Sequence, residues 1–283
     1  MSTSTAPSSG TVVASAALPR LLGRLQVIVM LLIVLTPLAW MFLSSFKSSV
    51  DVMSLPPRIF SAPTLNNYRE LFVRTEFLHN TYNSLVVSIG ATLLGLLLAI
   101  PAAFAVSWHR TTWPATLTLF ARMAPGTLFL LPWFILFQKV DLVGSYTVLI
   151  LTHSAITVPV ALWTLLPYFD RVPRALIESG QMDGCRPLAI LTRIALPLVI
   201  PGVVVAAILC FVFTWNYFLF ALALSGFDTK TAIVASFNFV GEGVTNWGAL
   251  MAAASMIALP PLVLALLVQR HLVAGLAVGA VKG

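Results

Sequence analysis

Long apolar segments separated by shorter polar ones run along almost the whole chain. Six segments are long and largely uncharged, and they span residues 25–43, 82–106, 116–137, 146–167, 199–224 and 248–269. A helix needs about twenty apolar residues to cross a bilayer, so each segment is predicted to be a transmembrane helix. Several contain proline, which membrane helices tolerate when neighbouring groups satisfy the freed carbonyls. The pattern predicts an all-α polytopic membrane protein with six transmembrane helices.

The segments between these helices set the expected boundaries. Residues 1–24 are predicted to be a cytoplasmic N-terminal tail, residues 25–269 the transmembrane domain, and residues 270–283 a cytoplasmic C-terminal tail. The first apolar run is too long for the core of a signal peptide, and no small-residue cleavage site follows it. We therefore expect it to remain attached as the first span.

Composition narrows the class of protein further. Of the 283 residues, 59% are hydrophobic and 9% are charged, against about 25% charged in soluble proteins, which excludes an ordinary soluble enzyme. The net charge of +7 does not indicate nucleic-acid binding, because the basic residues are spread singly along the chain. Cys185 and Cys210 form no CxxC pattern, and the four histidines form no i, i+4 pair, so no metal site is expected.

The distribution of Lys and Arg predicts the orientation in the membrane. Basic residues are expected to accumulate on the cytoplasmic side. With both termini inside, nine lie there, against six outside: Arg20, Arg24, Arg110, Arg171, Arg174, Arg186, Arg193, Arg270 and Lys282, against Lys47, Arg58, Arg69, Arg74, Lys139 and Lys230. We therefore expect both termini in the cytoplasm.

The most informative segment is the connection 168–198 between the fourth and fifth spans. Pro173 favours a helix that starts directly after it, and Asp183–Gly184 favours a turn. A second short helix is predicted from Pro187 to Leu196, ended by Pro197. The segment is thus predicted to be a helix–turn–helix on the membrane surface.

The same segment resembles the EAA motif of ATP-binding-cassette importer permeases. The match comprises Glu178-Ser179-Gly180, two residues, Asp183-Gly184-Cys185, and then Leu191, Ile194 and Leu196-Pro197, with three small residues replacing alanines of the family pattern. The resemblance implies a coupling helix that docks on a cytoplasmic ATPase subunit, with the contact made by Glu178, Ser179, Gly180, Asp183 and Gly184. The alternative is an interfacial amphipathic loop without a partner.

The C-terminus narrows the resemblance to the second permease subunit of maltose-type carbohydrate importers. It ends in Gly279-Ala-Val281-Lys282-Gly283, which is similar to the Gly-x-Val-Lys-Gly tail of that subunit and implies contact with the ATPases. A frayed terminus is the alternative. Asn66-Asn67-Tyr68, together with Asn80, Asn83 and Ser84, resembles the outer loop and second span of these permeases.

The fifth span contains Trp215-Asn216-Tyr217 and Phe220, similar to a Trp-Asn-x-Phe/Leu-Leu pattern of the same branch. Aromatic faces beside an amide suit a sugar, so these four residues are candidates for the translocation pathway. The alternative is structural, with Asn216 joining helices and Trp215 packing. Two further residues lie in apolar segments. Arg122 is expected to extend toward the cytoplasmic surface, and His153 is expected to be packed and hydrogen-bonded.

The resemblance implies a bacterial inner-membrane permease subunit of an ATP-driven, binding-protein-dependent importer of a sugar or sugar derivative. Its implied partners are a second related permease, two ATPase subunits and an extracytoplasmic solute-binding protein. The sequence has no G-x-x-x-x-G-K-[ST] loop, so ATP and Mg²⁺ are assigned to the ATPases, and this chain is expected to bind no cofactor and to be no enzyme. An ion-gradient-driven transporter of a small polar solute is the alternative. Its case is weak because the spans contain no acidic residue.

Overall fold

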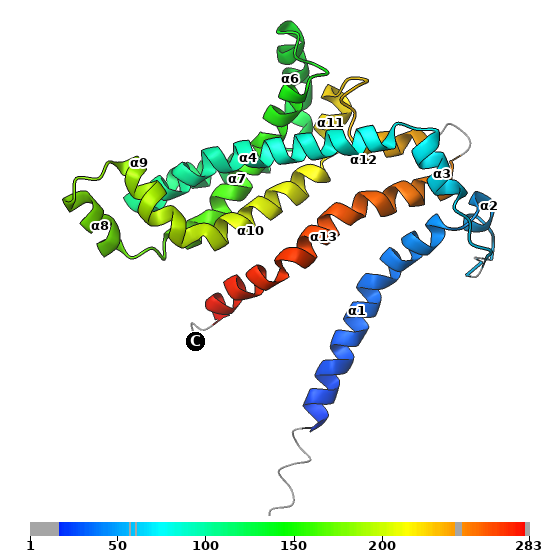
Figure 1. The fold of residues 1–283 in the computed structure, drawn as a ribbon, viewed down its shortest axis with the longest axis horizontal. Coiled ribbons are helices and arrows are strands. Elements are labelled where there is room, and N and C mark those ends of the chain that lie inside the picture. The colour runs from blue at the N-terminus through cyan, green and yellow to red at the C-terminus, as the bar shows by residue number, and fades with distance from the viewer. Residues whose placement is uncertain (1–16, 57, 60, 241–244, 281–283) are drawn as a thin grey trace, which may run out of the picture.

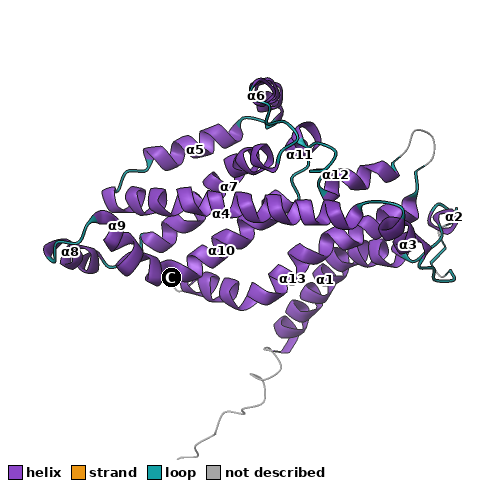
Figure 2. Cartoon of the chain, turned by 45° about the horizontal axis from the view of Figure 1, so that its top comes forward, coloured by secondary structure: helices purple, strands orange, loops and turns teal. Residues whose placement is uncertain are grey.

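All regular elements of the described residues are helices (Figure 1, Figure 2). The computed structural model describes residues 17–280 except 57, 60 and 241–244, with side chains described between residues 21 and 267. The elements are α1 (Ala17–Ser45), α2 (Ser49–Val52), α3 (Asn66–Val73), α4 (Phe77–His109), α5 (Trp113–Met123), α6 (Thr127–Lys139), α7 (Tyr146–Phe169), α8 (Arg174–Met182), α9 (Pro187–Ile190), a π-helical turn (Leu191–Ala195), α10 (Leu196–Trp215), α11 (Leu219–Leu224), α12 (Ala232–Ser236), a 3₁₀ turn (Phe237–Phe239) and α13 (Trp247–Ala280).

Helices α4, α7 and α10 pack side by side and form the centre of the bundle (Figure 1). Close approach of helices in a membrane depends on small residues at the contact. Gly95 of α4 lies directly against Thr157 of α7, and Gly202 of α10 lies against the ring of Tyr168, so that a Cβ at either glycine would overlap its neighbour. Helix α13 packs on α10, and α1 packs on α13 and diverges from the rest of the bundle.

The predicted spans are confirmed in part. In the part of the chain that the structure describes, five helices are long and apolar enough to cross a membrane, and a bent pair brings the number to six. The third predicted span, 116–137, is wrong as a single helix, because α5 and α6 meet at 93°. Ala124 adopts an extended conformation with ψ of 127°. The cause is Pro125, which disfavours the helical conformation in the residue before it.

The fifth predicted span, 199–224, also differs at both ends. Helix α10 ends at Trp215, and α11 begins only at Leu219. At the other end, α9, the π-helical turn and α10 form one continuous apolar span from Pro187 to Trp215. The expectation that Pro197 ends the helix is therefore wrong. Pro197 has no N–H for the carbonyl four residues earlier, and the wider π turn directly before α10 accommodates it.

Asparagine side chains fasten the end of the bundle that contains α2, α3 and α12. Asn83 of α4 donates from Nδ2 to the carbonyls of Asp228 and Lys230, each at 2.9 Å, and accepts from the Tyr146 hydroxyl at 2.6 Å. Asn67 of α3 donates to the carbonyls of Ser45 and Lys47 at 2.7 and 2.8 Å. These amides satisfy backbone carbonyls of irregular segments that have no helical partner, so their role is structural.

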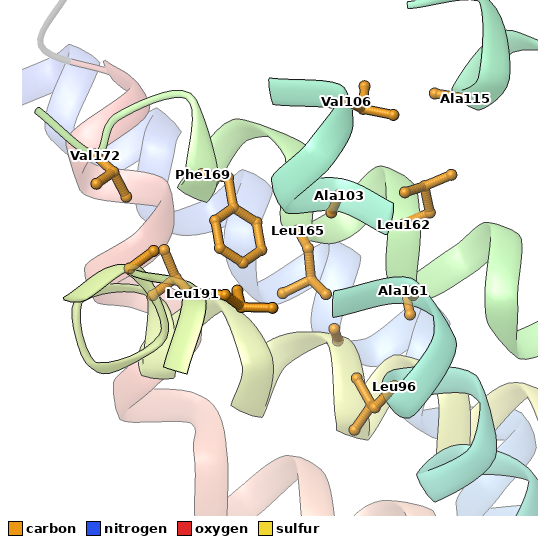
Figure 3. Packing of buried hydrophobic residues seen from close by; sticks show 14 of the residues in the cluster. Leu96, Ala103, Val106, Ala115, Ala161, Leu162, Leu165, Phe169, Val172 and Leu191 are labelled. Carbon is orange, nitrogen blue, oxygen red and sulfur yellow. The ribbon is translucent and has the colours of Figure 1, made fainter. Parts of the chain in front are cut away.

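The opposite end is held by apolar packing. The largest cluster of buried side chains extends along α4, α7 and α10 into the segment from Val172 to Ala195 and includes Phe169, Ile177 and Leu191. Figure 3 shows Phe169, Leu165 and Leu191 of this cluster between the end of α4, the end of α7 and the π-helical turn. The segment that carries the EAA-like motif is thus continuous with the core of the transmembrane bundle.

Candidate functional site

The predicted helix–turn–helix is present at residues 168–198, called here the α8–α9 loop. Helix α8 begins after Pro173, which is extended with ψ of 124°, and it ends at Met182 with Gly184 at φ +72°. The amide of Cys185 donates to the carbonyl of Gly180 at 2.9 Å, and that of Gly184 donates to Gln181 at 3.0 Å. This pair of hydrogen bonds is the Schellman motif, in which glycine is favoured because the backbone is left-handed. Gly184 therefore fixes the turn, as predicted.

The α8–α9 loop has one buried face and one exposed face. Ile177 is 6% exposed, and Gly180 lies against the side chains of Ile190 and Ile194. The other face exposes Glu178, Ser179 and Asp183 together with Met182, which is 88% exposed. Among the described residues, Glu178 has no hydrogen-bond or ion-pair partner. Helix α8 of the loop is therefore held against the bundle by its buried face, and its other face presents acidic and apolar side chains away from the bundle.

A second candidate site is an open cavity beside the bend between α5 and α6. This α5–α6 cavity has a volume of about 510 Å³ and is lined from α5, α6, α7, α10 and α11 by Ala121, Arg122, Ala124, Gly126, Phe129, Trp133, Ala155, Ile156, Pro159, Phe213, Tyr217 and Phe220. The rings of Phe129 and Trp133 are 5.6 Å apart, and those of Trp133 and Phe220 are 4.9 Å apart. Five of the twelve lining residues are therefore aromatic.

Polar groups also reach this cavity. The guanidinium carbon of Arg122 lies 5.1 Å from the centre of the Phe213 ring, a cation–π geometry. Tyr217 brings a hydroxyl that lies so close to Gly126 that a Cβ there would be 2.5 Å from it. Pro159 has no N–H, so the carbonyl of Ala155, four residues earlier, lacks its regular helical donor. The cavity thus combines aromatic faces with hydrogen-bond donors and an acceptor.

The four residues predicted for the pathway separate into two pairs. Tyr217 and Phe220 line the α5–α6 cavity. The indole of Trp215 is buried and donates at 2.9 Å to the carbonyl of Ile257 in α13. That carbonyl has no helical donor, because the residue four positions later is Pro261. Asn216 donates to Val212 in its own helix at 2.8 Å. Trp215 and Asn216 are therefore not brought to the cavity.

Arg122 differs from expectation, whereas His153 does not. Helix α5 starts at Trp113, which places Arg122 nine residues along it, roughly 13 Å at 1.5 Å per residue. Phe213, which the guanidinium contacts, lies one turn beyond Cys210, and Cys210 contacts Thr157 at the middle of α7. The expected extension to the cytoplasmic surface is therefore wrong. His153 is buried as expected, with Nδ1 2.7 Å from the Leu149 carbonyl of its own helix.

Of the predicted C-terminal contact residues, Gly279 falls in the last turn of α13. Val281, Lys282 and Gly283 lie outside the described residues. Their contact with an ATPase stays a prediction.

Comparison with known proteins identifies the family. Residues 91–278 match the model of the binding-protein-dependent transport system inner membrane component. This match covers the α8–α9 loop, the α5–α6 cavity, four of the six predicted spans and part of a fifth. The chain belongs to this family. It is therefore a multi-pass inner-membrane permease subunit of an ATP-binding-cassette importer, which works with ATPase and binding-protein partners and is not itself an enzyme. The resemblance to importer permeases, which the EAA-like motif first indicated, is confirmed.

Individual relatives cover nearly the whole permease. A probable ABC transporter permease of Sinorhizobium fredii is 35% identical over 266 residues, which is 93% of this chain and 96% of the relative. A trehalose transport system permease of Mycobacterium tuberculosis is 35% identical over 261 residues, 88% of this chain and 93% of the relative. A solved bacterial ABC transporter involved in alginate import shares the fold, with a TM-score of 0.72 and 19% identity. The match covers 94% of this chain and 99% of that chain.

Sequence reasoning missed most of the cavity of the permease. Phe129, Trp133 and Phe213 carried no signal beyond their apolar character, and Arg122 was placed at the wrong depth. The detectable signal was Pro125-Gly126 inside an apolar run, since this dipeptide is a strong mark of a chain break. This dipeptide predicts a break in the third span, two residues after Arg122.

Proposed function

We propose that this permease pairs with a second, related permease and imports a sugar or sugar derivative. Two ATPase subunits with their ATP and Mg²⁺, and an extracytoplasmic solute-binding protein, complete the assembly. The observation that carries the proposal is the α8–α9 loop, whose buried face joins the transmembrane core while Glu178 and Asp183 point outward. The sugar class is supported by relatives named for trehalose transport and by the aromatic walls of the cavity.

In the proposed mechanism the α8–α9 loop transmits movement of the ATPases to the spans. ATP binding closes the ATPase pair, and the loops of the two permeases approach each other. Because Ile177 and Leu191 are buried in the same cluster as Phe169 of α7, a displacement of α8 moves the ends of α7 and α10 with it. The solute pathway then opens to the outside, where the binding protein delivers its solute. Residues 279–283 form a second ATPase contact.

The coupling assignment is tested in the four-subunit complex with its binding protein. Glu178→Ala combined with Gly184→Pro removes the exposed carboxylate and a left-handed turn that proline cannot adopt. We expect loss of both ATPase co-purification and binding-protein-stimulated ATP hydrolysis. Asp141→Asn, an exposed acid between α6 and α7, is the control and leaves both intact. Intact assembly and coupled hydrolysis in the double variant would overturn the assignment, and uptake that needs an ion gradient instead of the ATPases would overturn the proposed function.

The proposed orientation has its own test in membrane vesicles. Cys185, half-buried at the end of the Schellman turn, is on the cytoplasmic side if both termini are inside, whereas Cys210 is fully buried. A membrane-impermeant maleimide is expected to label the wild-type chain in inside-out vesicles and not in right-side-out vesicles. Cys185→Ser is expected to abolish that labelling. Labelling in right-side-out vesicles alone would reverse the topology.

A further inference from the structure

We propose that the α5–α6 cavity is the solute-contacting site of this subunit and that Arg122 is its principal hydrogen-bond donor to oxygen atoms of a sugar-like solute. The inference rests on the proposed function and goes further, because it assigns a residue and a chemical class to the pathway. The groups concerned are Arg122, Tyr217, Trp133 and the carbonyl of Ala155.

The position of Arg122 carries the first step. An ionised side chain deep in a membrane is costly and marks an ion or solute pathway by default. Its guanidinium lies over the ring of Phe213, which is one turn beyond Cys210, and Cys210 contacts Thr157 at the middle of α7. Among the described residues the guanidinium forms no ion pair or hydrogen bond. Its N–H groups therefore remain available for a ligand.

The surroundings of Arg122 carry the second step. A guanidinium donates two parallel hydrogen bonds to paired oxygens, such as neighbouring hydroxyls or an acidic group. Trp133 and Phe129 offer faces for the C–H side of a sugar ring, while the Tyr217 hydroxyl and the Ala155 carbonyl supply a donor and an acceptor. A hydrocarbon ligand would leave these polar groups unpaired. The chemistry fits an oxygen-rich ring compound.

The interrupted helices carry the third step. The cavity lies between the break at Ala124–Gly126, which interrupts a candidate membrane span, and the break at Asn216–Phe218, which directly follows one. Irregular backbone within a membrane protein is tolerated where it lines a solute cavity, and transporters place their substrate sites at such discontinuous helices. The two helix breaks and the charge of Arg122 therefore border the same cavity.

The test uses cysteine accessibility in the assembled complex, in a Cys185→Ser/Cys210→Ala background. Ala155→Cys reports on the cavity, and Leu97→Cys, on the exposed outside of α4, is the matched control. Each is treated with an anionic reagent, 2-sulfonatoethyl methanethiosulfonate, and with its trimethylammonium counterpart. We expect Ala155→Cys to react and to prefer the anionic reagent by about tenfold, because a cationic group in a low-dielectric cleft concentrates anions. Leu97→Cys is expected to react with neither.

Arg122 is tested in the same background. Arg122→Gln is expected to abolish the anion preference, and Arg122→Lys is expected to retain it. Glucose and glucuronate, with glycine betaine as the osmotic control, are tested at high concentration as protecting probes. Protection by either sugar that is lost in Arg122→Gln supports the assignment, and protection by glucuronate alone assigns an acidic solute.

An unreactive Ala155→Cys, an anion preference unchanged in Arg122→Gln, or no protection by either sugar would each overturn the inference. These results are distinguishable from failure of the proposed function. If the complex assembles and couples ATP hydrolysis but gives one of these three results, only the assignment of the solute site is overturned. A chain that never assembles with ATPases overturns the proposed function instead.

Discussion

The α8–α9 loop and the α5–α6 cavity are built on opposite principles. The loop has regular helix, a Schellman turn and a buried apolar face, whereas the cavity lies between two helix breaks and contains a cation, Arg122, that has no ion-pair partner among the described residues. A coupling element has to transmit displacement without deforming, and burial of apolar side chains gives that stiffness. A pathway has to exchange contacts with a passing solute, so its polar groups need to remain without permanent partners.

The largest expected effect tests the bracing of the loop. Ile177→Ala removes a buried side chain, at a cost of about 2 to 5 kcal/mol, whereas Leu176→Ala removes one that is 44% exposed and is the matched control. We expect faster hydrogen exchange of the α8 amides and weaker coupled ATP hydrolysis in Ile177→Ala alone. Equal effects of the two variants would show that the loop is not held by its buried face.

The next effect concerns the crowding at the cavity. Gly126→Ala places a Cβ 2.5 Å from the Tyr217 hydroxyl, and overpacking of this kind costs about 1 to 3 kcal/mol. We expect slower labelling of Ala155→Cys by the anionic reagent, with assembly retained. Tyr217→Phe in the same chain removes the overlapping oxygen and is expected to restore labelling. If the second substitution gives no rescue, the overlap is not what closes the cavity.

A similar effect is expected at Trp215, for a structural reason. Trp215→Phe removes the N–H that satisfies the Ile257 carbonyl, and an unsatisfied buried group costs about 1 to 3 kcal/mol. We expect a lower midpoint of thermal unfolding and unchanged reagent preference at Ala155→Cys. A changed preference would return Trp215 to the pathway, as the sequence pattern predicted.

The smallest effect is expected at Gly184. Alanine there has to adopt a φ of +72°, which costs roughly 1 kcal/mol, while the open space around the residue excludes a steric contribution. Gly184→Ala is expected to fray the last turn of α8, seen as faster exchange of the Cys185 amide, with retained but reduced coupling. Gly184→Asn is expected to be milder, since asparagine tolerates this conformation. Identical behaviour of the two variants would contradict the role of the left-handed backbone.

The α8–α9 loop was predictable because local rules specify it. Pro173 sets its start and Gly184 its turn, and both act through their own backbone dihedral angles. The cavity was less predictable because it depends on contacts between distant segments. The indole of Trp215 donates to the Ile257 carbonyl, which is free because of Pro261. Pro261 lies forty-six positions after Trp215, and no local pattern links the two residues. Four spans were found from apolar length alone, while Pro125 and Asn216 interrupt the other two at points that hydropathy does not distinguish.

The π-helical turn at Leu191–Ala195 has a consequence for the direction in which the α8–α9 loop faces. A π turn accommodates one more residue than an α turn, and each residue of a helix advances its side chains by about 100°. The surplus residue therefore sets the azimuth of Glu178 around the axis of α10. Deletion of Thr192 is expected to shift the residues before the π turn by that angle relative to α10, so the orientation of the docking surface depends on the count of residues in one turn.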